Sequence, residues 1–397
     1  MKSIGQAFCL LAIILVGTTA CQHTAVERTD ENLIKELGER EAYEKLLNYG
    51  KSIGINTEKF AFREANAPVL GLLEEIGYGH KPANIKYIKK ENEADTAVIR
   101  QVGWNLVNDE PKEMAELEPI MASLEPPYDS YRQLKNHYKR LQGENKGDSA
   151  AIVAASLNAY RWIHRQARQA ERLVMVNIRG AYLKGIDATG KDAMNMRVIT
   201  GKKDTPTPSM DTYATQIITY PYWNVPTSIA TKEMLPKIKN DLGFLERNKI
   251  EVINGQGERV EPGEIDWYSL SESDFPYRFR QDTGEDNSLG LLKVDIENPH
   301  AIYLHDTNAR YLFAKDQRWR SHGCVRVQHP ADLANFMAGE KLLENEFLED
   351  PKEDHPPKSH PFSKKVPVFL FYLGADINEA GQLVYFEDVY GWDKRTA

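Results

Sequence analysis

The sequence of 397 residues lacks the features that mark several common protein classes. Basic residues are not in excess, since 50 Lys and Arg stand against 58 Asp and Glu for a net charge of -8, and we expect no nucleic-acid partner. Residues 255–260 lack the third glycine and the strand-to-helix context of a nucleotide-binding loop, so no cofactor is indicated. With 41% hydrophobic and 10% aromatic residues, the composition is typical of a globular protein of two or three domains.

Long hydrophobic runs are also missing. The apolar run Phe8–Val16 has nine residues, whereas a helix that spans a bilayer of about 30 Å needs about 20. Lys2 precedes the run and small residues follow it up to Ala20, which is the arrangement of an export signal. The alternative, a buried N-terminal helix, lacks the polar residues that would give it a solvated face. We therefore predict that residues 1–20 are a signal peptide.

Cysteine is scarce, with three residues in the chain: Cys9, Cys21 and Cys324. Cleavage of the signal removes Cys9, and the remaining two cannot build a disulfide framework. Residues 18–21 resemble a bacterial lipoprotein signal, in which Cys21 carries the lipid; Thr18 departs from that pattern, and the segment also suits ordinary signal cleavage. The sequence thus predicts a periplasmic lipoprotein that is anchored to a membrane through Cys21.

The chain changes character near residue 171. Residues 31–170 are predicted to be mainly helical, because apolar residues recur at spacings of three and four, and a polar linker at 143–149 separates two of the helices. From residue 171 onwards, short strand-like runs are separated by turn signals. We predict an α+β fold in which a helical domain at 31–170 precedes a mostly β domain at 171–397.

Three features interrupt or end the β half. A charged helical stretch, Thr231–Arg247, predicts an insertion on the β framework. A helix at 330–344 and a Pro- and His-rich loop at 350–361 follow later. The last two strand-like runs, 366–373 and 382–386, flank a polar turn and are expected to pair as a C-terminal hairpin.

The residues that suggest chemistry lie in two short segments, Tyr303–Thr307 and Ser321–Arg326. Cys324 is the one internal cysteine, and a cysteine nucleophile needs a basic partner because a free thiol, with a pKa of about 8.5, is little ionised at neutral pH. His305 and His322 are the candidate partners. Gly323 leaves room beside the backbone, so the amides of Gly323 and Cys324 are a candidate oxyanion hole.

Two other interpretations of these residues remain. Cys324 is also compatible with a small buried hydrophobic side chain among structural histidines. A metal site is the third interpretation, although the segments lack a second cysteine and any CxxC or HExxH element. The local density of Tyr303, His305, His322 and Arg326 favours the nucleophile.

The spacing of these residues resembles a known family. His305 is followed by fifteen residues and then by Ser321-His322-Gly323-Cys324, which is similar to the signature of L,D-transpeptidases with a YkuD-type catalytic domain. Further segments resemble the long, YcbB-like periplasmic subfamily: Leu157–Trp162, Val176–Ile178, Trp223–Pro226, Asp266–Trp267, Phe275–Arg278 and Asn287–Gly290. The linker at 143–149 leaves no room for the peptidoglycan-binding module that many members insert there.

The resemblance implies a domain plan and roles for the site residues. Residues 31–170 would be a scaffold, and 171–397 the catalytic domain, with a capping insertion at about 232–290 and the hairpin within 366–393. Cys324 would be the nucleophile and His305 its base, oriented by a backbone carbonyl near Asp306. The remaining implied roles are support of the site by His322 and Gly323, and contact with substrate by Tyr303, Trp223, Asn224, Ser321 and Arg326.

The resemblance also implies a reaction, in which the Cys324 thiolate attacks a peptidoglycan stem peptide at its third residue and expels the terminal D-Ala. An amine of a second stem then resolves the thioester into a 3→3 crosslink, and carbapenems are expected to acylate the same cysteine. A hydrolase, or an enzyme that attaches a protein to peptidoglycan, would use the same residues. A lipid-anchored, non-catalytic wall-binding protein is the alternative outside the enzymes.

Overall fold

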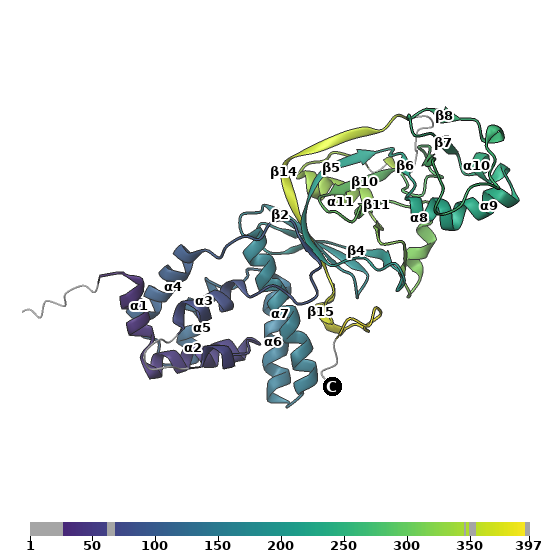
Figure 1. Cartoon of the computed structure of the whole chain (residues 1–397). Coiled ribbons are helices and arrows are strands. Elements are labelled where there is room, and N and C mark those ends of the chain that lie inside the picture. Colours follow the sequence, from purple (N-terminus) through teal and green to yellow (C-terminus); the bar gives the residue numbers. More distant parts are fainter. Residues whose placement is uncertain (1–26, 62–67, 345–346, 349–354, 394–397) are drawn as a thin grey trace, which may run out of the picture.

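The structure is a computed structural model that describes residues 27–61, 68–344, 347–348 and 355–393. The predicted signal peptide and Cys21 lie outside the described residues. Figure 1 shows helices at the N-terminal end, a β body in the middle and a smaller lobe at the far end. The α+β fold predicted from the sequence is therefore confirmed. None of the described helices combines the length and the apolarity needed to cross a membrane.

The N-terminal part consists of helices whose starts follow local signals. Thr29 and Asp95 accept hydrogen bonds from the first backbone amides of α1 and α4, which satisfies donors that a helix start leaves open. The helices are α1 (Asp30–Leu37), α2 (Arg40–Ser52), α3 (Val69–Tyr78), α4 (Thr96–Asp109), α5 (Met114–Ala122), α6 (Asp129–Gly143) and α7 (Gly147–Ala167), with a 3-10 turn η1 (Glu58–Phe60).

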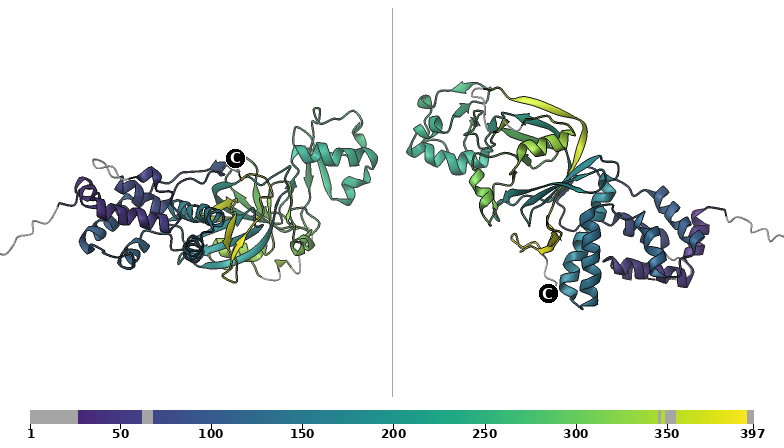
Figure 2. Two further views of the ribbon diagram at one scale, coloured as in Figure 1. Left: turned by 90° about the horizontal axis from the view of Figure 1, so that it is seen from below. Right: turned by 180° about the vertical axis from the view of Figure 1, so that it is seen from behind.

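The apolar core divides these helices into two groups. Residues of α1 to α5 pack among themselves in one cluster, which ends at Leu124. The apolar faces of α6 and α7 instead belong to a cluster that includes Met175 and Phe369 of the sheet. Figure 2 shows the α6–α7 pair standing against the β body. The two long helices thus connect the N-terminal helices to the β body.

The β body is a sheet that closes on itself. The strand order is β1-β5-β10-β11-β13-β4-β3-β2-β14, and β14 also pairs with β5, which closes the strands from β5 to β14 into a ring with β1 beside β5. The strands are β1 (Tyr87–Ile88), β2 (Arg172–Asn177), β3 (Tyr182–Asp187), β4 (Asp192–Gly201), β5 (Met210–Thr219), β10 (Leu292–Ile296), β11 (Tyr303–His305), β13 (Val325–Val327) and β14 (Lys358–Phe371), with β12 (Trp319–Ser321) beside β4. Their inward side chains form one apolar core with helix α11 (Pro330–Ala338).

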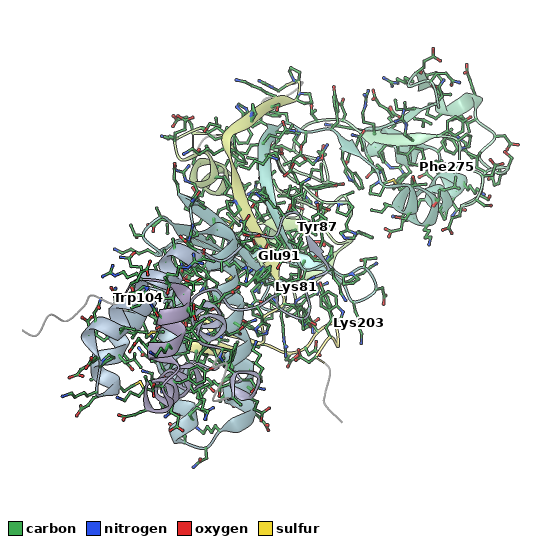
Figure 3. All side chains as sticks on the ribbon, turned by 60° about the vertical axis from the view of Figure 1, so that its left-hand side comes forward. Lys81, Tyr87, Glu91, Trp104, Lys203 and Phe275 are labelled. Atoms are coloured by element: carbon green, nitrogen blue, oxygen red, sulfur yellow. The ribbon has the colours of Figure 1, made fainter. Side chains whose placement is uncertain are left out.

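The lobe is a subdomain inserted between β5 and β10. It has its own sheet, in the order β6-β9-β7-β8, and its own apolar cluster from Val225 to Phe279. Its elements are β6 (Trp223–Asn224), α8 (Thr227–Ile229), the π-helix η2 (Ala230–Met234), α9 (Leu235–Asn240), α10 (Gly243–Arg247), β7 (Ile250–Ile253), β8 (Arg259–Val260), η3 (Pro262–Glu264) and β9 (Arg278–Gln281). Figure 3 places Phe275 in this lobe and Trp104 among the N-terminal helices, at opposite ends of the molecule.

The insertion therefore begins earlier than the predicted residue 232. Trp223 and Asn224 already pair with Gln281 and Arg280 in the sheet of the lobe. The prediction used the start of the charged helical stretch as the boundary. A two-residue strand carries too little periodicity for the sequence to reveal which sheet it joins.

The C-terminal segments also differ from the prediction. Residues 366–371 belong to β14, which pairs with β2 and β5, and the hairpin consists of β15 (Ala375–Ile377) and β16 (Leu383–Tyr385). β14 already begins at Lys358, inside the predicted loop, whose residues 350–354 lie outside the described part. Helix α11 ends at Ala338 rather than at residue 344, because Gly339 adopts a left-handed conformation with φ of 76°.

Candidate active site

The site is built on two adjacent parallel strands, β11 and β13. Leu304 pairs with Val325 and His305 pairs with Arg326. Leu304 and Val325 are fully buried in the core of the β body. Because side chains alternate along a strand, Tyr303 and His305 of β11 lie on the opposite face, together with Arg326 and the preceding Cys324. The pairing therefore gathers four predicted site residues on one face of the sheet.

Cys324 is the one cysteine among the described residues, and its side chain is half-buried. Its Sγ atom lies 3.6 Å from the carbonyl oxygen of Ala301. Burial raises the pKa of the Cys324 thiol, whereas hydrogen bonds from the backbone and side chain of Tyr303 act in the opposite direction. In the resting site the sulfur is consequently a protonated thiol that Tyr303 is placed to stabilise once it ionises.

His305 is buried, with 5% of its surface exposed. Burial, and secondly the positive charge of Arg326, lower the pKa of His305 to about 3, so the ring is neutral and can accept a proton. Its edge faces the Tyr303 ring at a centroid distance of 5.5 Å. The Nδ1 atom is buried without a hydrogen-bond partner among the described residues. Hydrogen bonding to the backbone of Asp306 and of Leu289 nevertheless acts on the pKa of His305 in the raising direction, so the backbone near Asp306 lies beside the imidazole, as predicted.

The turn that carries Cys324 is held by Ser321. The Ser321 Oγ atom accepts a hydrogen bond from the Gly323 amide at 3.1 Å and donates one to the Cys324 carbonyl at 2.6 Å. Gly323 has φ of 120°, a conformation that side chains other than glycine rarely adopt. Its carbonyl oxygen accepts a hydrogen bond from Thr207 at 2.7 Å. Because Ser321 is buried and engaged on both sides, it positions the turn rather than facing the cleft with a free hydroxyl.

This arrangement changes the predicted oxyanion hole. The Gly323 amide already donates to Ser321, so of the two predicted donors the Cys324 amide is left as the candidate. The sequence does not show that the Gly323 amide is already engaged. The Ser321 side chain can adopt several rotamers, and only the folded turn selects the one that accepts this hydrogen bond.

Arg326 is a half-buried cation beside the thiol. Burial lowers the pKa of its guanidinium, and its buried Nε atom has no hydrogen-bond partner among the described residues. An unsatisfied guanidinium in a cleft is suited to bind a carboxylate. Across the sheet, Lys293 lies over the Tyr303 ring, with its Nζ atom 4.6 Å from the ring centroid.

A cleft of about 490 Å³ lies between this face and the inserted subdomain. His305, His322, Cys324 and Arg326 line one wall, and residues of η2 and α9 line the other. An adjoining cleft of about 300 Å³ shares Trp223 and Tyr303 with it and is also lined by Asn224. A hydrogen bond from the Trp223 side chain reaches that of Tyr303. Trp223 thus separates the two clefts, and Asn224 lies in the second, away from the thiol.

His322 reaches across the first cleft to a residue that the sequence analysis missed. Its Nε2 atom lies 2.6 Å from Oε1 of Glu233, which belongs to η2 of the inserted subdomain. The two residues are 89 positions apart, and nothing in the local pattern around Glu233 distinguishes it from other exposed acidic residues. No group of three or more His, Cys, Asp or Glu side chains suited to a metal ion occurs in the described ranges.

Comparisons with known proteins agree with this geometry. Residues 171–366 match the family model of YkuD, the L,D-transpeptidase catalytic domain. A Haemophilus influenzae protein, provisionally described as an L,D-transpeptidase, is 36% identical over 206 residues, which cover 51% of this chain and 41% of that protein. The matched region thus spans about two fifths of the length of this relative.

Several solved structures also match, and two of them are described. One is the catalytic domain of an Enterococcus faecium L,D-transpeptidase acylated by ertapenem, with 14% identity, a TM-score of 0.20, and coverage of 51% of this chain and 97% of that one. The other is an L,D-transpeptidase from Mycobacterium smegmatis, with 13% identity, a TM-score of 0.22, and coverage of 51% and 58%. These scores are too low to carry an argument, and the assignment depends on the family model. We conclude that residues 171–366 form an L,D-transpeptidase catalytic domain of the YkuD family.

Proposed function

We propose that the protein is a periplasmic L,D-transpeptidase that crosslinks peptidoglycan stem peptides through a thioester on Cys324. The observation that carries this proposal is the position of the half-buried thiol, next to Tyr303 and on the same sheet face as a neutral His305. A nucleophile, its stabilising neighbour and a proton acceptor thereby line one cleft.

In the first half-reaction, the thiol attacks the carbonyl of the third residue of a tetrapeptide stem. Because the pKa of Cys324 is raised and that of His305 is lowered, both groups start neutral and the proton moves to His305 as the C–S bond forms. The Cys324 amide is the candidate donor to the oxyanion. The imidazolium then protonates the departing amine, D-Ala leaves, and a thioester remains on Cys324.

In the second half-reaction, the side-chain amine of another stem attacks the thioester and gives a 3→3 crosslink. Arg326, with its unsatisfied Nε atom, is the group that we assign to a carboxylate of the donor stem. Attack by water instead would make the protein an L,D-carboxypeptidase. The inserted subdomain forms one wall of the cleft, and we propose that it limits the access of water to the thioester.

Two further properties are proposed on the basis of the sequence. Cys21 is the proposed lipid attachment site, which would hold the enzyme at a membrane surface facing the periplasm. Carbapenems are proposed to acylate Cys324; the catalytic domain of the Enterococcus faecium L,D-transpeptidase is described as acylated by ertapenem.

The proposal is tested by incubating the purified protein with disaccharide tetrapeptides and analysing the products by mass spectrometry. We expect dimers with a 3→3 bond and free D-Ala, and the Cys324→Ala variant should yield neither. Tripeptides without dimers would identify a hydrolase. Dimers in the presence of Cys324→Ala would exclude the thioester mechanism.

A further inference from the structure

Glu233 and His322 form a carboxylate–imidazole pair on the solvent side of the catalytic cleft. Their Oε1 and Nε2 atoms are 2.6 Å apart, and the side chains are 44% and 36% exposed. Glu233 comes from the inserted subdomain, whereas His322 lies two residues before the nucleophile. The subdomain therefore places a charged side chain directly on the catalytic turn.

Both walls of the cleft carry charged side chains. Arg326 is on the sheet face, whereas Glu233 and Lys237 are on the inserted subdomain, and Glu233 is the one carboxylate among the described residues that line the cleft. A carboxylate of the donor is attracted to Arg326, and an ammonium is attracted to Glu233. The acceptor in the proposed second half-reaction is an amine, which at neutral pH is an ammonium with a pKa of about 10.4 and cannot attack until it loses a proton.

We propose that the His322–Glu233 pair binds the acceptor ammonium and removes its proton before attack on the thioester. This inference rests on the proposed transpeptidase function. His322 is the proton acceptor, and Glu233 acts through it as a positioning residue: by accepting a hydrogen bond from Nε2, it leaves Nδ1 free to take the proton and stabilises the imidazolium that results.

His305 is less suited to this first deprotonation. It is 5% exposed and stands beside the positive Arg326, which repels an approaching ammonium. An amine that enters from solvent reaches the exposed His322 first. The two histidines thereby have different roles. His305 exchanges protons with the thiol and the leaving group, and His322 takes the proton of the incoming amine.

The proton balance follows from this division. The acceptor ammonium gives one proton to His322, which passes it to water because the pair is exposed. The neutral amine attacks the thioester carbonyl, the C–N bond forms, and the C–S bond breaks. The second proton of the nitrogen moves through His305 to the sulfur of Cys324. The step yields an amide, a free thiol and one proton released to solvent.

The test uses the full-length protein and an N-acetylated tetrapeptide that contains meso-diaminopimelate, so that its one free amine is on the acceptor side chain. Dimer and hydrolysed tripeptide are measured by mass spectrometry, and acylation by ertapenem is measured separately. We expect Glu233→Gln to lower the ratio of dimer to tripeptide about tenfold. This decrease should be at least five times larger than any decrease in the rate of acylation by ertapenem. Glu233→Asp should restore part of the ratio.

A matched control is Glu272→Gln, because Glu272 lies on the same subdomain in an exposed ion pair with Lys232, 3.0 Å away. This variant should keep the wild-type ratio. An unchanged ratio in Glu233→Gln, or an equal loss of acylation and dimer formation, would overturn the inference. A wild-type protein that produces tripeptide and no dimer would instead overturn the proposed crosslinking function, and this inference with it.

Discussion

His305 on β11 and Arg326 on β13 are direct register partners in the parallel pairing of these two strands. After burial, the guanidinium is the next largest cause of the lowered pKa of His305. A positive neighbour opposes the imidazolium, so the pairing keeps the proposed base neutral across the physiological pH range. Arg326 thereby tunes the base in addition to any contact with substrate.

Replacing Arg326 with Gln should raise the pKa of His305 from its value of about 3, because the repulsion is lost while the burial remains. His305 accepts a proton only above its pKa, so the acid limit of base function should move to higher pH. NMR titration of histidine-labelled protein measures the shift, and the His305→Gln variant assigns the resonance. Arg326→Lys keeps the charge and should titrate close to wild type; equal pKa values in all three proteins would contradict the coupling.

Replacing Ser321 with Ala should misplace the nucleophile, because the Gly323 amide and the Cys324 carbonyl both lose their partner. We expect a loss of about 1 kcal/mol in the free energy of unfolding and a decrease of about tenfold in acylation, since small misplacements are costly in catalysis. Urea unfolding and the rate of ertapenem adduct formation measure the two effects. Ser321→Thr keeps a hydroxyl and should retain most of the rate; equal loss in both variants would argue against the hydrogen bonds as the cause.

His164 should make the protein less stable in mild acid. The ring stacks on Tyr78 at 5.4 Å, and burial lowers the pKa of His164 to about 4. The unfolded chain, with a histidine pKa near 6.5, binds the proton more readily, so stability is lost as the pH falls from about 6.5 towards 4. Between pH 7 and pH 5 we expect His164 to account for about 1–2 kcal/mol.

Urea unfolding at both pH values tests this expectation, with His164→Phe as the variant because it keeps the stacked ring. The stability of the variant should depend less on pH than that of the wild type. An identical loss in both proteins would assign the acid sensitivity to other groups, among which His305 also has a lowered pKa.

Lys184 should be a large contributor to stability. It is 1% exposed on β3, and its Nζ atom lies 3.1 Å from Asp192 and 3.4 Å from Asp376. Lys184→Met leaves the buried Asp376 and the half-buried Asp192 without their cation, and breaking a buried pair on one side costs about 3–5 kcal/mol. Lys232→Met, which removes an exposed pair with Glu272, is the control and should cost less than about 1 kcal/mol. Urea unfolding compares the two; similar losses would contradict the role assigned to burial.

One strand of the β body shows what a local sequence pattern can and cannot predict. The apolar run at residues 366–371 predicted a strand correctly, but a short apolar run fits a hairpin arm as well as a strand of a closed sheet. Val368 and Leu370 contact the core inside the β body, whereas Phe369 and Phe371 contact the helices α6 and α7. Burial on both faces excludes a terminal hairpin for this segment, and only the assembled structure contains that information.

The sequence by itself determined which residues make up the candidate reactive centre, because the motif that contains them is local. His305 is followed by fifteen residues and then by the turn Ser321–Cys324, so one short segment contains the whole motif. Position 323 in that turn is the glycine that the turn needs. The tertiary structure decided which groups meet: it engaged the Gly323 amide with Ser321, buried His305 beside Arg326, and brought Glu233 to His322 across 89 residues. Such contacts depend on how sheets and insertions pack, and packing is set by the whole chain rather than by any one segment.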